Sequence, residues 1–482
     1  MPHPITHTQL FINNKWCDSH SGDRLPTIDP STEEIICEVA CGNAQDIDDA
    51  VRAAQIAFAG PWTKTEPRES SHLLYQLSLA IRADADQLAT LETLDTGKPL
   101  SHAKGEVLGA ARYFEYYAGL ADKVHGETIP IGNDYIDFTL IEPLGVTAHI
   151  VPWNAPLSMV ARSVAPALAT GNTAVVKPAE QTPLSALALG AMMQTVGFPA
   201  GVYNVVNGFG YEAGAALSSH AGIHSLTFTG SVPTGRQVMQ AAAEQIKPVV
   251  LELGGKSPQL VFRDADLDHA VAEVAKGIYS NTGQYCDAGS RLVIDTAIKQ
   301  PFLEKLVAYT KDLKIGEGMD DPDMGPLVSA EHLERVMDYV RKGTKAGAQL
   351  LTGGDRPAYL KRGYFLAPTI FDQVTVEMAI AQEEIFGPVL SVLSFEDEAE
   401  AVEIANNSVY GLGAGIFTRD IDRALRLTKK LQTGYVMINE YFAGDIGAPF
   451  GGYKQSGIGR ERGLVALQNY TQTKNVTLRI RS

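Results

Sequence analysis

Apolar residues recur at helical spacing through much of the first quarter of the chain. They do so in AQDIDDAVRAAQIAF, residues 44–58, and in the Ala- and Leu-rich stretch from Ser70 to Thr93. Apolar side chains three and four residues apart lie on one face of a helix, and that face packs against the rest of a protein. We therefore expect most of residues 45–120 to be helical.

From about residue 145 the pattern changes to short β-rich runs, each followed by a helical stretch. The runs are GVTAHIV, NTAVVKP, VYNVV, HSLTFTG and VVLELGG. Strands that alternate with helices predict parallel pairing in a doubly wound sheet, which binds ligands at the carboxyl ends of its strands. Thr182 and Pro183 are expected to begin the helix after NTAVVKP, as the N-cap and the first helical residue.

A second alternating region runs from about Ser257 to Phe450 and predicts another α/β domain. Two segments fit neither region. ETIPIGNDYIDFTLIEP, residues 127–143, predicts a hairpin with Gly132-Asn133-Asp134 at its turn, and NYTQTKNVTLRI, residues 469–480, alternates like a strand. We interpret both segments as arms that add strands to a neighbouring subunit.

Composition narrows the classes of function. The 482 residues suit two or three domains, and the formal net charge of −16 argues against a nucleic-acid partner, which needs a basic face. The N-terminus lacks the positive segment and apolar core of a secretory signal, and no apolar stretch approaches the roughly 20 residues of a membrane helix. We expect a cytoplasmic protein with a small-molecule substrate and no membrane partner.

The four cysteines do not follow the pattern of a disulfide framework. Cys17, Cys37 and Cys41 crowd the N-terminal segment, and Cys286 stands alone in the second half. Cys37 and Cys41 lack a second ligand pair, so we interpret them as thiols and expect no metal. Cys286, which follows Gly283-Gln284-Tyr285, is either a nucleophile or, as most isolated cysteines are, a small buried hydrophobe.

Two further clusters lie at the ends of predicted strands. Glu252 in LELGGKSP, residues 251–258, is either a general base or an ion-pairing or capping residue. Phe228-Thr229-Gly230-Ser231 leads a strand into a helix whose first N–H groups suit a phosphate. Gly230 and Gly235 have the spacing G-x-x-x-x-G, which is not the usual dinucleotide fingerprint. Each cluster alone is a weak signal.

Seven blocks in one order make the chain resemble the aldehyde dehydrogenase superfamily over nearly its whole length. The blocks are PWN (152–154), KPAE (177–180), FTGS (228–231), LELGGKSP (251–258), GQYCDAGSR (283–291), EEIFGPV (383–389) and PFGGYKQSGIGRE (449–461). The resemblance implies an α/β fold that forms a homodimer or homotetramer. Its implied parts are a doubly wound, parallel-sheet cofactor domain at 1–122 and 143–254, an α/β catalytic domain at 255–455, and a small β oligomerisation arm at 123–142 and 466–482.

The resemblance also implies catalytic roles for three residues. Cys286 attacks the aldehyde carbon to give a thiohemiacetal, and its backbone N–H forms an oxyanion hole with the Asn154 side chain. Such donors, aimed at a developing alkoxide, are typically worth ~3–4 kcal/mol. Hydride then passes to the nicotinamide, and Glu252 draws a proton from the water that hydrolyses the thioester. A carboxylate whose pKa is raised towards neutrality suits that task.

The implied cofactor is NAD, with NADP disfavoured. Glu180 is expected against the adenosine ribose, where a carboxylate accepts from both hydroxyls and repels a 2′-phosphate. Nearby Lys177 softens that repulsion, and Glu384 and Phe386 resemble the pair that holds the nicotinamide ribose and ring. The cofactor residues that the resemblance implies are Trp153, Lys177, Glu180, Gly210, Gly230, Ser231, Glu384 and Phe386.

Arg162 carries our expectation about the substrate. It lies eight residues after Asn154, about two helical turns or ~12 Å along the axis, on the face that lines the substrate tunnel in the family. A guanidinium there either clamps a distal carboxylate or pairs with an acidic neighbour away from the substrate. Succinate-semialdehyde enzymes carry an arginine at the position of Arg162 and a second one at the position of Ser280, so Ser280 argues against a substrate that must end in a carboxylate. Tyr285 and Phe442 could instead offer aromatic walls. We expect a polar, carboxylated (semialdehyde) or aromatic aldehyde.

Asp287 departs from the family pattern, in which a small neutral residue often follows the nucleophile. A carboxylate at this position raises the pKa of the Cys286 thiol unless it points away or pairs with a cation such as Arg291. We do not expect the change to remove the activity.

Three other functions stay open. A coenzyme A-acylating dehydrogenase passes the thioester to coenzyme A, whereas Glu252 favours water as the acceptor. A cysteine hydrolase needs a histidine motif near Cys286, which the sequence lacks. An inactive binding or structural relative has little reason to keep Asn154, Glu252, Cys286 and Glu384 together.

Overall fold

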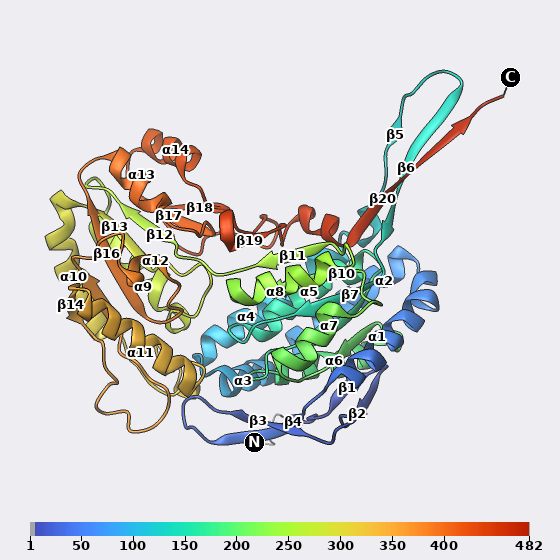
Figure 1. Ribbon diagram of the computed structural model, residues 1–482, viewed down its shortest axis with the longest axis horizontal. Coiled ribbons are helices and arrows are strands. Elements are labelled where there is room, and N and C mark those ends of the chain that lie inside the picture. The colour runs from blue at the N-terminus through green and yellow to red at the C-terminus, as the bar shows by residue number, and fades with distance from the viewer. Residues whose placement is uncertain (1–4, 482) are drawn as a thin grey trace.

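Four β-sheets organise the chain in the computed structural model, which describes residues 5–481 (Figure 1). The largest sheet has eight strands, and its five central strands are parallel, as expected for a doubly wound α/β fold. The strand order reverses between β7 and β10, whose carboxyl ends therefore open a crevice for a ligand. In spatial order the strands are β19 (Gly457–Ile458), β11 (Val249–Glu252), β10 (Ser225–Thr229), β7 (Val146–Ile150), β8 (Thr173–Lys177), β9 (Tyr203–Val205), β1 (Leu10–Ile12) and β2 (Lys15–Cys17).

Helices cover both faces of this sheet because each buried strand sends alternate side chains to opposite sides. In β8, Ala174 and Val176 pack into one core with α5 and α6, whereas Val175 packs into the other core with α1, α7 and α8. These helices are α1 (Ala44–Ala59), α5 (Pro156–Ala169), α6 (Leu184–Val196), α7 (Ala215–Ser219) and α8 (Val232–Ala243).

The predicted start of α6 is wrong. Helix α6 begins at Leu184, after Pro183, and the Thr182 hydroxyl donates to the Trp153 carbonyl at 3.5 Å instead of capping the helix. The cap comes from another helix, because a carboxylate oxygen of Asp95 accepts the Leu184 N–H at 3.2 Å. A tertiary contact therefore satisfies a helix terminus that the local sequence leaves open.

The expected helices before residue 120 are present and pack beside α5 and α6. On α2, Leu74, Leu77 and Ile81 are fully buried at helical spacing. Burial of such a side chain stabilises the fold by about 1.5–3 kcal/mol. The helices that follow α1 are α2 (Pro67–Ala83), α3 (Ala85–Thr96) and α4 (Leu100–Ala118).

The second sheet has seven strands, of which only β14, at one edge, is antiparallel. Helices α9 and α10 pack into one of its cores, and α11 to α14 into the other. The predicted second α/β region is therefore confirmed. Its strands in spatial order are β14 (Gln349–Thr352), β15 (Thr369–Asp372), β16 (Val389–Phe395), β13 (Arg291–Asp295), β12 (Pro258–Val261), β17 (Gly413–Phe417) and β18 (Tyr435–Ile438), and its helices are α9 (Leu267–Tyr279), α10 (Lys299–Asp312), α11 (Ala330–Lys345), α12 (Ala379–Gln382), α13 (Glu398–Asn406) and α14 (Ile421–Lys430).

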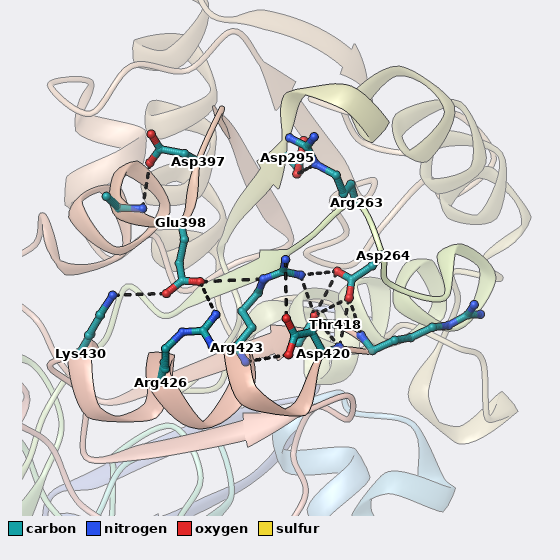
Figure 2. Close-up of polar contacts among 12 residues, drawn as sticks. Arg263, Asp264, Asp295, Asp397, Glu398, Thr418, Asp420, Arg423, Arg426 and Lys430 are labelled. Atoms are coloured by element: carbon teal, nitrogen blue, oxygen red, sulfur yellow. Dashed lines mark hydrogen bonds and ion pairs between the residues drawn. The ribbon is translucent and has the colours of Figure 1, made fainter.

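Charged side chains hold the carboxyl end of the second sheet together (Figure 2). Asp264, which follows β12, accepts a hydrogen bond from the Thr418 hydroxyl at 2.9 Å and from Arg423 at 2.6 Å. Glu398 of α13 pairs with Arg426 of α14 at 3.0 Å. These contacts fix α13 and α14 to the segments that follow β12 and β17.

A three-stranded antiparallel sheet projects from the body of the molecule (Figure 1). It contains β5 (Thr128–Ile129), β6 (Tyr135–Pro143) and β20 (Thr471–Arg479). The predicted turn is confirmed, because Gly132 has a φ of +142° and its carbonyl accepts the Tyr135 N–H at 3.2 Å. The two segments expected to extend a neighbour pair with each other inside the chain, from Pro143 opposite Thr471 to Tyr135 opposite Arg479.

No helix within residues 5–481 is long and apolar enough to cross a membrane. The same residues hold no group of three or more His, Cys, Asp or Glu side chains arranged for a metal ion. All four cysteines are free thiols.

Candidate active site

Residues from five of the sequence blocks line one pocket, where the carboxyl end of the first sheet meets the amino end of the second. Glu252 is the last residue of β11, whereas Cys286 precedes β13 and Glu384 precedes β16. Cys286 also lines a second pocket with Tyr285 and Phe442. Its side chain thus belongs to a wall that two pockets share, where it can meet ligands from both sides.

A strained turn positions Cys286. Asn281, Thr282 and Gly283 have left-handed φ values of +48°, +59° and +73°. A Cβ on Gly283 would lie 2.2 Å from the Gly387 carbonyl oxygen, so only glycine fits there. The Asn281 side chain donates to the Asn154 carbonyl at 3.1 Å. Backbone outliers of this kind persist only where the surroundings hold them, and they gather at functional sites.

The glycines of LELGGKSP allow close approach to the predicted catalytic groups. A Cβ on Gly254 would lie 2.2 Å from a Glu384 carboxylate oxygen, and one on Gly255 would lie 2.3 Å from the Cys286 carbonyl oxygen. The Gly255 N–H also donates to Glu384 at 3.1 Å. This turn therefore brings Glu252, Cys286 and Glu384 around one backbone segment.

Asn154 is held in place through both its side chain and its backbone. Its Nδ2 donates to the Gln284 carbonyl at 2.8 Å, two residues before Cys286. Its backbone carbonyl accepts from the Lys98 ammonium at 2.6 Å, and Lys98 forms a buried ion pair with Glu106. An amide has two N–H groups, so the second remains for a ligand on the side of Cys286.

The half-buried Cys286 thiol has a pKa well above its ordinary value, first because of desolvation and second because Asp287 is negatively charged. The Asp287 carboxylate accepts a hydrogen bond from the Tyr435 hydroxyl at 2.7 Å. Arg291 does not pair with Asp287, because it donates to the backbone carbonyls of Lys256 at 2.8 Å and of Ala405 at 2.7 Å. The resting thiol is therefore protonated, and it would need a base to act as the predicted nucleophile.

Glu252 provides a buried carboxylate next to that thiol. It is 1% exposed, and neither of its carboxylate oxygens accepts a hydrogen bond. Burial raises its pKa well above the ordinary value, and Arg162, 3.6 Å away, opposes that rise. The Arg162 guanidinium also forms a buried ion pair with Glu461. The sequence left open whether Arg162 pairs with acidic neighbours, and the structure places it between two of them.

The pocket on the Glu384 side of Cys286 is built around an aromatic pair. Trp153 and Phe386 meet edge to face at 5.2 Å, and the His332 ring nitrogen lies 2.7 Å from the Phe386 carbonyl. Burial lowers the pKa of His332 to about 4, so this ring is neutral and donates. Glu384, whose pKa burial raises to about 7, lies on the same wall.

A third, elongated pocket follows the crevice between β7 and β10. Gly210, Gly230 and Ser231 line it, together with Lys177 and Glu180, which form an ion pair at 2.8 Å. The Gly230 N–H is taken by the Glu252 carbonyl at 3.0 Å. The Ser231 hydroxyl caps α8 by accepting the Thr234 N–H at 3.4 Å. Gly230 thus lets a ligand approach its backbone closely but has no free N–H to donate. The free donors at the start of α8 are the N–H groups that follow Gly230 in the chain.

The pocket on the other side of Cys286 has aromatic walls. Tyr285 and Phe442 meet edge to face at 5.5 Å, and the Tyr285 hydroxyl donates to Glu106 at 2.6 Å. Arg162 and Ser280 also line this pocket. The structure thus gathers all four residues that the sequence analysis weighed for the substrate.

Sequence reasoning missed several residues of these pockets. His332 and Arg335 line the Glu384 side, and His102, Phe450 and Arg462 line the aromatic side. Only Phe450 and Arg462 could have been found from the sequence, because the block PFGGYKQSGIGRE contains Phe450 and ends directly before Arg462.

Comparison with known proteins gives one consistent result. The profile described as "Aldehyde dehydrogenase family" matches residues 16–476. Retinal dehydrogenase 2 of Homo sapiens is 44% identical over 481 residues, which cover 99% of this chain and 92% of that protein. The NAD+ complex of an aldehyde dehydrogenase from Bacillus cereus is 45% identical with a TM-score of 0.97, covering 99% and 97% of the two chains. Betaine aldehyde dehydrogenase from Staphylococcus aureus in complex with NAD+ is 38% identical with a TM-score of 0.97, covering 99% and 96%.

Proposed function

Because this chain belongs to the aldehyde dehydrogenase family, we propose that it oxidises an aldehyde to the carboxylic acid through a thioester on Cys286, with NAD as the hydride acceptor. One aldehyde, one NAD+ and one water give one carboxylate, one NADH and two protons. The observation that carries this proposal is that Cys286 lines two pockets, one for each reactant, with Glu252 and Asn154 beside it.

The first step forms a carbon–sulfur bond. The Cys286 thiol is protonated at rest, so Glu252 accepts its proton as the sulfur attacks the aldehyde carbon. The aldehyde oxygen takes up the electron pair of the broken π bond. The free N–H of the Asn154 amide and the backbone N–H of Cys286 stabilise that oxyanion, and one such donor is worth about 3 kcal/mol.

The second step turns the adduct into a thioester. The oxyanion re-forms a carbonyl, and the carbon–hydrogen bond gives up its electron pair as hydride. NAD, when bound, supplies the acceptor for that hydride. The residues that would hold it are Trp153, Lys177, Glu180, Gly210, Gly230, Ser231, Glu384 and Phe386. Their donor set fits a dinucleotide: a carboxylate at each end suits a ribose, and the start of α8 between them suits a pyrophosphate.

The third step releases the product. Glu252 first releases the thiol proton to solvent and is a carboxylate again. It then takes a proton from a water that attacks the thioester carbon, and the thiolate leaves as the acid forms. A carboxylate with no hydrogen-bond partner in the dry interior is free to orient such a water. The coenzyme A-acylating alternative needs no base at this point. Acid formation that does not depend on added coenzyme A distinguishes the two.

The substrate pocket supports a polar, carboxylated or aromatic aldehyde. Tyr285 and Phe442 present ring faces and edges, which suit a flat or unsaturated chain. A charged guanidinium that lines the same pocket suits an aldehyde whose other end is an anion.

The projecting arm supports assembly into a homodimer or homotetramer. Its strands expose apolar side chains to solvent, and a three-stranded sheet with such a face is a surface for another chain. The exposed apolar residues of the arm include Ile131, Ile136, Leu140, Leu478 and Ile480. Mass measurement in solution on the full chain and on a variant with these residues made polar tests this.

Replacement of Cys286 tests the chemistry directly. Cys286→Ala should abolish NADH formation from any aldehyde and leave NAD binding intact, because the thiol is needed only for the covalent steps. Turnover near the normal rate in this variant would refute the mechanism.

A further inference from the structure

Arg462 is a cation without a partner in the pocket that holds Cys286. It lines that pocket, its Nε is buried without a hydrogen-bond partner, and no ion pair of residues 5–481 includes it. Its φ is +62°, a left-handed conformation that is rare outside glycine. A buried donor without a partner and a strained backbone both oppose folding. Proteins keep such features mainly at functional sites.

The comparison with Arg162 isolates what is unusual about Arg462. Both guanidiniums lie over the Phe450 ring, with centroid distances of 4.5 Å for Arg162 and 4.6 Å for Arg462. Arg162 is neutralised by Glu461 and Glu252. Arg462 shares the ring and the pocket, but no carboxylate among the described residues lies within ion-pairing distance of it.

The acidic side chains of this pocket are already engaged. Glu106 pairs with Lys98 and accepts from Tyr285, and Asp287 accepts from Tyr435. The positive charge of Arg462 thus faces a pocket in which other groups satisfy the negative charges. A ligand that brings its own anion fills this gap.

We propose that Arg462, rather than Arg162, recognises the substrate by binding a carboxylate at the end remote from the aldehyde. The preferred substrate is then a carboxylated aldehyde whose middle part packs against Tyr285, Phe442 and Phe450. A guanidinium presents paired donors that match a carboxylate, and stacking on Phe450 fixes its plane. This inference rests on the proposed function, because it assigns the second pocket to the aldehyde.

The test compares two aldehydes that differ only in charge. 4-Formylbenzoate and 4-formylbenzamide have the same shape, and only the first is an anion. We expect the wild type to favour the benzoate in kcat/KM. Arg462→Leu should lower kcat/KM for the benzoate at least tenfold and change that for the benzamide less than twofold. Arg462→Lys should fall between, because it keeps the charge but loses the paired donors.

Arg112→Leu is the matched control, since Arg112 also lies over an aromatic ring, that of Tyr116 at 5.7 Å, but outside the pocket. It should leave both values unchanged. Equal losses on both aldehydes in Arg462→Leu, or a wild type that does not favour the benzoate, overturns the inference. If Arg462→Leu does not fold, Arg462→Gln and Arg462→Lys carry the same comparison. Failure of the proposed function has another signature, namely NADH formation that survives Cys286→Ala.

Discussion

The guanidinium of Arg162 lies 3.6 Å from the carboxylate of Glu252, and both side chains are almost completely buried. Glu461 pairs with the same guanidinium. Burial raises the pKa of Glu252 most, Arg162 lowers it, and Glu461 raises it. Arg460 and Arg462 also lower this pKa. Burial and the surrounding charges together therefore set the pH range in which Glu252 can act as the proposed base.

Replacing Arg162 should move the pH dependence of turnover. Arg162→Leu removes the charge that lowers the pKa of Glu252, so that pKa rises further. Glu252 must be ionised to act as a base, and the acidic limb of the kcat profile should therefore shift to higher pH. Because Arg162 acts through Glu252, we expect equal losses on 4-formylbenzoate and 4-formylbenzamide. A selective loss on the benzoate would restore Arg162 as a substrate contact.

The Glu461→Gln variant should shift the acidic limb of the kcat profile in the opposite direction. Removing Glu461 takes away a charge that raises the pKa of Glu252, so the acidic limb should shift to lower pH. Both variants break a buried ion pair and should lower the free energy of unfolding by about 3–5 kcal/mol. If the acidic limbs of both variants shift in the same direction, the shifts reflect loss of structure. Thermal unfolding measures that loss independently.

Glu252→Gln should separate the two halves of the reaction. We expect NADH to appear in a burst approaching one per site, formed more slowly than in the wild type because Cys286 also loses its base. A steady state at least ~100-fold slower than normal should follow, since the base for water is missing. Hydroxylamine, a stronger nucleophile than water, should restore turnover and give the hydroxamate. If steady-state turnover stays normal, another residue activates the water.

Glu180→Gln should weaken the preference for NAD. The Glu180 carboxylate, paired with Lys177 at 2.8 Å, accepts from ribose hydroxyls and repels a 2′-phosphate. We expect the ratio of kcat/KM for NAD over NADP to exceed ten and to narrow at least tenfold in the variant, about 1.4 kcal/mol. Glu244→Gln removes a charge from another residue that lines the same pocket and should alter the ratio much less. Equal use of both cofactors by the wild type would contradict this assignment.

Gly283→Ala should disrupt the turn before Cys286. The residue has a φ of +73°, and the new methyl group would lie 2.2 Å from the Gly387 carbonyl oxygen. We expect the free energy of unfolding to fall by more than about 1 kcal/mol, with loss of activity. Gly109→Ala is the control, because Gly109 lies inside α4 with open space around it, and alanine there should stabilise by about 0.5–1 kcal/mol. Chemical denaturation of both variants gives the comparison.

The sequence predicted what local periodicity determines and missed what distant residues determine. The alternation of strands and helices after residue 145 and the turn at Gly132 depend on neighbours in the chain, and both are confirmed. The cap of α6 comes from Asp95, and the partner of Arg162 is Glu461, about 300 residues away. No local pattern encodes such pairings. The unpaired state of Arg462 was hidden for the same reason, because it depends on which carboxylates other residues engage.

The high pKa of Cys286 also bears on how the resting molecule meets oxidants. Peroxides attack thiolates, and a sulfur that keeps its proton reacts slowly towards sulfenic acid. Burial raises the pKa values of Cys17, Cys37 and Cys41 as well. Every thiol of the chain is thus stored in its unreactive form. In the proposed mechanism Cys286 becomes nucleophilic only while Glu252 accepts its proton and the sulfur attacks a bound aldehyde, so the thiol should resist oxidation between turnovers.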